Sequence, residues 1–104
     1  MSLSIDNLDK KVLISIQTPR LTGESRLVEQ VLQASLGEDI EEFVFDFSRV
    51  EYINSLGMAE LVALYHNLSR IYKKPFRWRF THLNPSIARI LRMVDLGKIA
   101  HIED

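Results

Sequence analysis

The sequence from Phe43 to Tyr72, FVFDFSRVEYINSLGMAELVALYHNLSRIY, decides the fold of this chain. It begins with an apolar run, from Phe43 to Phe47, of the kind found in a central strand that is covered on both faces. Apolar residues then recur at three- and four-residue steps, which is the spacing of one helical face. These positions are Met58, Leu61, Val62, Tyr65, Leu68 and Tyr72. We therefore predict a buried strand, a short loop and a helix with an apolar core-facing side.

The polar junction Asn54-Ser55-Leu56-Gly57 lies between this strand and this helix. It places the hydroxyl of Ser55 at the expected N-terminus of the helix. A hydroxyl in that position can cap the helix, act as a nucleophile or accept a phosphate group. A cap from Asn54 or Ser55 would be worth about 1 kcal/mol. Local chemistry alone leaves these three roles open.

Strands and helices alternate along the rest of the chain. Strands are predicted at 12–17, 76–80 and 98–102, with residues 3–5 as a short edge that pairs with the first of them. Parallel neighbouring strands need crossover connections, which the intervening helices provide. The expected fold class is α/β: one domain over residues 1–104, with a four- to five-stranded, mostly parallel sheet and three main helices.

Two further helices are predicted from their end signals. The first follows a loop at Thr18–Gly23, with Thr22 or Ser25 as its cap and Gly37 at its C-terminus. The other begins at Asn84-Pro85, an N-cap residue followed by proline at the first helical position, and is closed by Gly97. Their apolar stripes are Leu27, Val31, Leu32 and Leu36 in the first helix, and Ile87, Ile90, Leu91 and Val94 in the second.

Composition excludes several classes of protein. The chain has 104 residues, of which 46% are hydrophobic and 26% charged, as in ordinary globular domains. Its net charge of −1 gives no general attraction to nucleic acid or to anionic membranes, and it has no cysteine for disulfides, thiolate metal sites or nucleophilic catalysis. It has neither a signal-peptide core nor a run approaching the ~20 apolar residues of a membrane span. We expect a cytoplasmic protein that neither binds nucleic acid nor inserts into a membrane.

The sequence offers no set of catalytic residues. The four glycines are scattered and form no phosphate-binding loop, and His66, His82 and His101 lack metal-ligand spacing, so we expect them at the surface. Asp46, at the end of the central strand, could be functional or could orient the next loop through backbone hydrogen bonds. Ser55 has no identifiable base. We therefore expect a protein that is not an enzyme and has no cofactor or metal.

Two separated segments resemble the signature of the STAS domain, as found in bacterial anti-sigma factor antagonists. The segment from Asp46 to Ala59 is similar to the family pattern in which a strand ending in aspartate leads to Asp-Ser-[Ser/Thr]-Gly and a helix. The segment from Asn84 to Ile99 is similar to the second family motif, which begins with Ser-Pro. Together the two resemblances cover nearly the whole chain and occur in the expected order.

The resemblance implies a role for Ser55 as a phosphoacceptor. In the family the kinase is the anti-sigma factor, which has a histidine-kinase-like ATPase fold, and a metal-dependent serine/threonine phosphatase reverses the reaction. The unphosphorylated antagonist binds the kinase and releases the sigma factor. The resemblance places the partner-binding surface around the Ser55 junction and the first loop. The residues concerned are Asn54, Leu56, Gly57, Met58, Arg20 and Leu21.

The chain also departs from the family pattern. Asn54 replaces an aspartate, Leu56 replaces a second hydroxyl residue, and Asp95 stands where the second motif usually has glycine. The first loop lacks two acidic residues of the family and gains Arg20, which suggests a non-standard partner. The altered loop at Thr18–Leu21 and Leu56 leave open an alternative, a constitutive STAS accessory or scaffold subunit such as one of a lipid-transport ABC complex, in which Ser55 would be only a cap. A nucleotide- or lipid-binding enzyme domain is a remote third reading.

Overall fold

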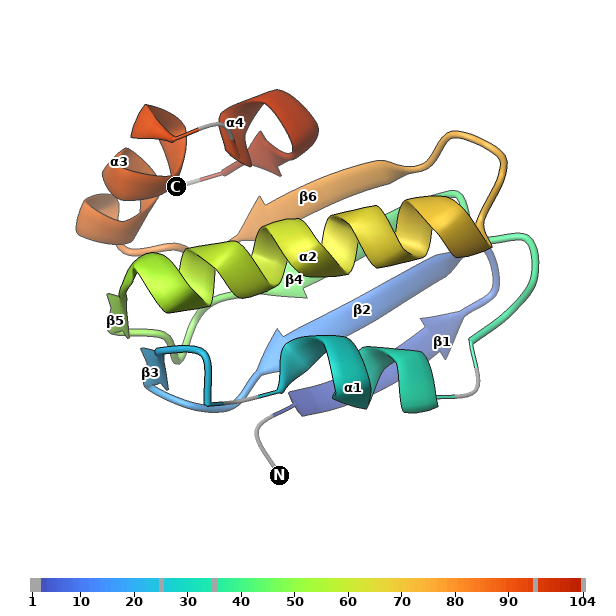
Figure 1. Cartoon of the computed structure of the whole chain (residues 1–104), viewed down its shortest axis with the longest axis horizontal. Helices are drawn as coiled ribbons and strands as arrows, with labels where there is room; N and C mark the ends of the chain where they lie inside the picture. The colour runs from blue at the N-terminus through green and yellow to red at the C-terminus, as the bar shows by residue number, and fades with distance from the viewer. Residues whose placement is uncertain (1–2, 25, 35, 95, 104) are drawn as a thin grey trace.

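The chain folds around a five-stranded sheet with the strand order β1-β2-β4-β6-β7 (Figure 1). The computed structural model describes residues 3–24, 26–34, 36–94 and 96–103. β1 is antiparallel to β2, and the other neighbours in this sheet are parallel. The mostly parallel α/β architecture predicted from the sequence is thus confirmed. The strands are β1 (Leu3–Leu8), β2 (Lys11–Ile16), β4 (Glu42–Asp46), β6 (Arg77–Thr81) and β7 (His101–Ile102).

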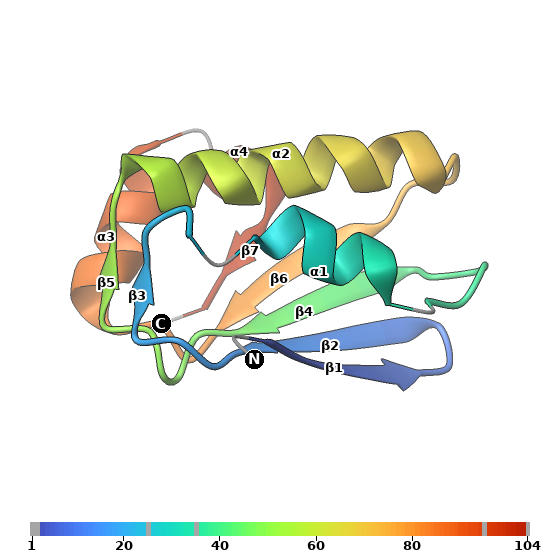
Figure 2. The same cartoon turned by 60° about the horizontal axis from the view of Figure 1, so that its bottom comes forward.

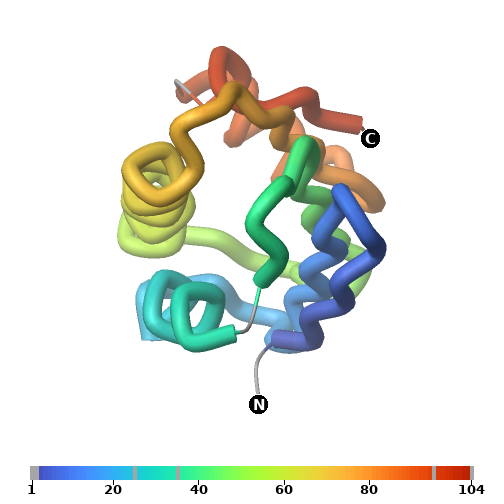
Figure 3. The backbone as a smooth tube through the Cα atoms, turned by 90° about the vertical axis from the view of Figure 1, so that its right-hand side faces the viewer, coloured from blue at the N-terminus to red at the C-terminus, as the bar shows by residue number. Residues whose placement is uncertain are grey.

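Helices α1 (Leu27–Gln33) and α2 (Ser55–Ile71) cover one face of this sheet (Figures 2 and 3). Helices α3 (Pro85–Met93) and α4 (Leu96–Ile99) lie beside β6 and β7 (Figure 1). Among the described residues, no helix is long and apolar enough to cross a lipid bilayer.

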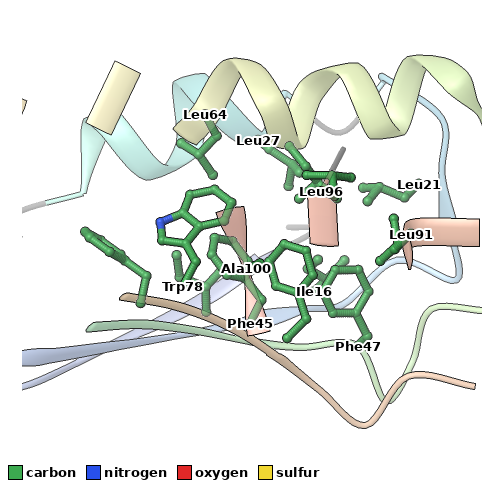
Figure 4. Packing of buried hydrophobic residues seen from close by; sticks show 14 of the residues in the cluster. Ile16, Leu21, Leu27, Phe45, Phe47, Leu64, Trp78, Leu91, Leu96 and Ala100 are labelled. Carbon is green, nitrogen blue, oxygen red and sulfur yellow. The ribbon is translucent and has the colours of Figure 1, made fainter. Parts of the chain in front are cut away.

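The core lies between the two central strands and α2. Phe45 and Phe80 are fully buried on neighbouring strands, with ring centroids 5.4 Å apart. Figure 4 shows Leu64 of α2 packed above Trp78 and Phe45. The predicted apolar side of α2 is only partly right. Its fully buried residues are Leu61, Leu64 and Leu68, and Leu64 is not among the predicted positions. The other predicted positions, Met58, Val62, Tyr65 and Tyr72, are partly buried against the same cluster.

A cross-strand ion ladder lies on the opposite face of the sheet. Glu42 of β4, only 8% exposed, lies between Lys11 of β2 and Arg77 of β6, at 3.4 and 3.8 Å. The register places these three residues side by side, because Lys11 pairs with Glu42 and Glu42 with Arg77. The nearly buried carboxylate is thus matched by a cation on each side.

The start of α1 differs from the prediction. Arg26 precedes the helix with φ of 52° and makes no side-chain cap, and the N–H of Leu27 instead donates to Glu60 Oε2 of α2 at 3.0 Å. Thr22 is therefore not the cap, and Ser25 lies outside the described residues. The helix ends at Gln33, so Gly37 lies beyond its C-terminus. Since the acceptor at this N-terminus comes from a distant helix, no local pattern could have revealed it.

The C-terminal region confirms one prediction and corrects another. Asn84 caps α3 by accepting the N–H of Ile87 at 2.9 Å, with Pro85 as the first helical residue. However, α3 ends at Met93, and Gly97 lies inside α4 rather than closing α3. The predicted strand at 98–102 shortens to His101–Ile102, because the preceding residues complete a turn of helix.

Candidate functional site

Two very short strands lead the chain into α2. β3 (Arg20–Leu21) and β5 (Tyr52–Ile53) pair in parallel as a separate two-stranded sheet near the N-terminus of α2 (Figure 2). The N–H of Asn54 continues this pairing by donating to the carbonyl oxygen of Leu21 at 3.3 Å. The first loop and the Ser55 junction, more than thirty residues apart, are therefore held together by backbone hydrogen bonds.

Gly57 allows α2 to start directly against β3. A Cβ at this position would overlap the carbonyl oxygen of Leu21, and it would lie 2.8 Å from the Leu21 carbonyl carbon and 3.1 Å from Ile53 Cγ1. The first two of these neighbours are backbone atoms of a fully buried residue, so they cannot move aside cheaply. Glycine at position 57 is thus required for α2 to begin this close to the backbone of β3.

Asn54, rather than Ser55, caps α2. Its side-chain oxygen accepts the N–H of Gly57 at 2.9 Å, as expected for an N-cap residue with extended backbone. Ser55 is the first helical residue and is exposed, and within the described part of the chain its hydroxyl makes no hydrogen bond. The N–H groups of Ser55 and Leu56 have no intrahelical acceptor at this end of the helix.

The electrostatic setting of the Ser55 hydroxyl favours an anion. The first turn of α2 contains no acidic residue, and the helix dipole places partial positive charge at this end. A phosphate group on Ser55 would therefore meet free N–H donors and a favourable field. The hydroxyl can accept a phosphate group without losing a hydrogen bond that the fold uses.

The residues around Ser55 form an exposed surface that we call the α2 entry face, consisting of Arg20, Tyr52, Ser55 and Leu56. Leu56 is 63% exposed and Tyr52 is 42% exposed, both high values for such apolar side chains. The guanidinium of Arg20 stacks over the ring of Tyr52 at 4.4 Å from its centroid. This contact, typically worth about 0.5–1 kcal/mol at an exposed site, holds the cation beside the apolar surface.

The structure separates the six predicted partner-binding residues into two groups. Arg20 and Leu56 are exposed, whereas Leu21 is fully buried and Gly57 is buried against it. Asn54 and Met58 are half-buried. Arg20 and Leu56 are therefore the two members of this set with the most surface open to a partner, and the other four lie beneath or beside them. Tyr52 is not among the residues predicted for this surface, because its only signal in the sequence is its alternation with the buried Ile53.

Asp46 takes the second of its two predicted roles. Its Oδ1 accepts the N–H of Ser48 at 2.9 Å and lies 3.4 Å from Nδ1 of His82, so the carboxylate orients the loop after β4. His66, His82 and His101 are exposed. No group of three His, Asp or Glu side chains suited to a metal ion occurs among the described residues.

Known proteins with a similar sequence pattern or a similar structure identify the family of this chain. The family model of the STAS domain matches residues 3–104, and the chain therefore belongs to the STAS domain family. Among solved structures, the anti-sigma factor antagonist SpoIIAA in its unphosphorylated form is similar, with a TM-score of 0.61. The match covers 98% of this chain and 87% of that one at 11% sequence identity. At this identity the likeness shows a shared fold.

Proposed function

We propose that this STAS chain is a phosphorylation-switched binding protein that acts as an anti-sigma factor antagonist. When Ser55 is unphosphorylated, the α2 entry face binds a serine-kinase anti-sigma factor with a histidine-kinase-like ATPase fold, or a related switch kinase, which then releases its target. The chain contributes binding and no catalysis. A serine/threonine phosphatase restores the binding form. All these partners act in the cytoplasm, where ATP is present.

One observation carries this proposal: the cap of α2 comes from Asn54, which leaves the adjacent Ser55 hydroxyl exposed and without a structural hydrogen bond. If Ser55 were only a cap, its oxygen would accept a backbone N–H of the first turn. The structural role and the acceptor role are thus divided between two neighbouring residues. STAS membership and the similarity to the unphosphorylated antagonist SpoIIAA add support.

The switch follows from the surroundings of the hydroxyl. Phosphorylation adds about 1.5–2 negative charges at neutral pH. The fold tolerates them, because an anion at a helix N-terminus gains about 0.3–1 kcal/mol. A partner that covers the exposed Leu56 must instead desolvate the phosphate, which costs several kcal/mol unless the phosphate is paired. The fold is therefore retained while partner binding is lost.

The acceptor assignment is tested by incubating the chain with its candidate kinase and ATP and mapping phosphate by mass spectrometry. Ser86 provides a matched control, because it is also an exposed serine in the first turn of an asparagine-capped helix. We expect phosphorylation of wild type and Ser86→Ala, and none of Ser55→Ala. Undiminished phosphorylation of Ser55→Ala would show that another residue is the acceptor.

The switch itself is tested by calorimetric titration of the same kinase with charge variants. Ser55→Asp should weaken binding by about tenfold or more, which corresponds to about 1.4 kcal/mol. Ser86→Asp should bind like wild type. Equal affinity for both aspartate variants would refute the electrostatic mechanism, whatever the acceptor is.

The second candidate function is a constitutive accessory subunit, for example of a lipid-transport ABC complex. The large exposed fraction of Leu56 favours it, because an apolar residue beside the acceptor suits a permanent interface. In that case Ser55 isolated from cells carries no phosphate, the chain co-purifies with a membrane ATPase, and Leu56→Ser disrupts that complex whereas Ser55→Ala does not.

A further inference from the structure

A second candidate site lies beside the first residues of β6, away from the α2 entry face. A half-open hollow of about 510 Å³ is formed here by α2, β6 and the α4–β7 segment. Tyr65, which lines it, is ten residues after Ser55 and therefore about 15 Å further along the axis of α2. We call it the β6 hollow. Its lining residues are Glu42, Tyr65, Phe76, Arg77, Trp78, Arg79, Lys98, Ile99, Ala100 and His101.

The hollow exists because β7 is shorter than β6. Among the described residues β7 pairs only with Arg79 and Phe80, so no strand lies beside β6 at Arg77 and Trp78. The N–H of Arg77 bonds to β4 at the carbonyl oxygen of Glu41. Because successive N–H groups of a strand point to opposite edges, the N–H of Trp78 faces the open edge. A ligand there would meet a backbone donor.

Aromatic rings form the floor of the β6 hollow. Tyr65 contacts Trp78 and Phe76 edge to face, with centroid distances of 5.3 and 5.7 Å. Trp78 is only 2% exposed, so its ring belongs to the core, whereas Tyr65 and Phe76 are half-buried and keep ring surface open. Such a floor favours a flat apolar body that can stack or meet the rings at their edges.

The rim of the hollow is cationic. Arg77, Arg79 and Lys98 line it together with one carboxylate, Glu42, which pairs with Lys11 and Arg77. Arg77 and Arg79 alternate with Trp78 along β6, so they start on the far face of the sheet and line the hollow at the open edge of the strand. A guanidinium presents parallel N–H donors that match the geometry of a carboxylate. A ligand carboxylate at this rim would take the place of one of the two carboxylates, Glu42 and Glu103, that now pair with Arg77 and Arg79.

Two nitrogen donors of the lining are buried without a hydrogen-bond acceptor: Trp78 Nε1 and Arg79 Nε. Arg79 Nε lies 3.6 Å from Glu103 Oε1, within ion-pair range but without a hydrogen bond. Figure 4 shows the indole nitrogen on the edge of Trp78 that faces away from Phe47 and Leu91. Buried unsatisfied donors cost about 1–3 kcal/mol each, and they mark places where an acceptor would be stabilised.

From these features we propose that the β6 hollow binds a small aromatic carboxylate that lies across the open edge of β6, with its ring over Tyr65 and Phe76 and its carboxylate paired with Arg79. In this arrangement the ligand carboxylate replaces Glu103 beside the guanidinium. Glu103 is thus an internal competitor, and its removal strengthens binding. The site is independent of Ser55 phosphorylation and of the partner that the α2 entry face takes.

The test uses 2-naphthoate as the probe, with 2-naphthylmethanol as its neutral analogue and acetate as the charge without the ring. Trp78 is the only tryptophan of the chain, so its fluorescence and its single indole N–H resonance report on the site without a label. We expect saturable binding of 2-naphthoate, with amide shifts centred on residues 76–79 and 98–101. The neutral analogue should bind about tenfold more weakly, and acetate should not shift these resonances.

Variants then test the assigned roles. Arg79→Gln should weaken 2-naphthoate binding about tenfold, the range expected for losing a charged hydrogen bond, and Glu103→Gln should strengthen it. Arg89→Gln is the matched control, because Arg89 is exposed on α3 and is not among the lining residues. The proposal is overturned if the chain shows no saturable shift, if the neutral analogue binds equally well, or if Arg79→Gln and Arg89→Gln behave alike. The Glu103 variant keeps the test decisive should Arg79→Gln fail to fold.

Discussion

Substituting alanine for Gly57 tests the close approach on which the α2 entry face depends. In a helix, Gly→Ala normally stabilises by about 0.5–1 kcal/mol. At this position the new Cβ would overlap the carbonyl oxygen of Leu21 and lie 2.8 Å from its carbonyl carbon. The same carbonyl is bonded to the N–H of Asn54, so β3 cannot shift without loosening the entry to α2. We therefore expect Gly57→Ala to destabilise the protein instead of stabilising it.

The expected magnitude follows from two opposing contributions. Overpacking a closely packed site costs about 1–3 kcal/mol, and the helix preference of alanine returns about 0.5–1 kcal/mol. The midpoints of these two ranges leave a net loss of about 1 kcal/mol, which corresponds to a decrease in Tm of about 4–8 °C for a domain of this size. Urea and thermal unfolding followed by circular dichroism would measure both quantities.

Gly97→Ala is the matched control for this measurement. A Cβ at Gly97 would meet its nearest neighbour, Arg92 Cα, at 3.8 Å, which is ordinary van der Waals contact. This variant should be neutral or slightly stabilised. A Gly57→Ala protein as stable as wild type or as Gly97→Ala would show that α2 does not begin against β3, and the derived geometry of the entry face would fail with it.

Three further predictions concern stability. Asn54→Ala removes the cap of α2 and should lower the free energy of unfolding in urea by about 1 kcal/mol. Asn54→Asp should keep the stability of wild type, because aspartate caps a helix equally well. An equal loss of stability in both variants would argue against the cap. Glu42→Gln removes the charge of a nearly buried carboxylate that lies between two cations, and it should lower the free energy of unfolding by about 1 kcal/mol. Glu41→Gln is the control: Glu41 belongs to an exposed ion pair, so the variant should stay within about 0.5 kcal/mol of wild type. Burial raises the pKa of the Tyr72 hydroxyl above its ordinary value of 10.0, so the folded state holds this proton more tightly than the unfolded state does. The contribution of the protonated Tyr72 hydroxyl to the free energy of unfolding is therefore complete below pH 10, and it is lost as the pH rises through the folded-state pKa. Tyr72→Phe, which also loses the hydrogen bond to the Gly37 carbonyl oxygen, should be less stable than wild type at pH 7, and the difference should shrink above pH 10; a constant difference would exclude the linkage.

The sequence predicted the elements that have long repeating patterns or strong end signals. The strand at Phe43, the helix after Ser55 and the Asn84-Pro85 helix start all agree with the structure. The two-residue strands β3 and β5 were missed, because alternation cannot be recognised over two residues. The prediction that Gly37 and Gly97 end helices is wrong, and neither glycine has the positive φ that makes glycine favourable at a helix end.

The candidate site was predictable in position but not in its internal arrangement. The apolar periodicity from Met58 onward placed Ser55 at the start of a helix, and the structure puts it there with an exposed side chain. Asn54 rather than Ser55 supplies the cap, and the backbone of Asn54 is held by its N–H, which continues the pairing of β3 with β5. The same pairing buries Leu21 and Gly57. Contacts between segments so far apart in the chain leave no local pattern to read.

The contact between Glu60 and the first amide of α1 has a consequence for the order of folding. A seven-residue helix is too short to persist alone in water, and this one receives its N-terminal acceptor from a residue 33 positions later. We therefore expect α1 to form only after α2 has docked on the sheet. In hydrogen exchange, the amides of α1 should then open whenever α2 detaches, so that the first helix of the chain becomes protected after the second.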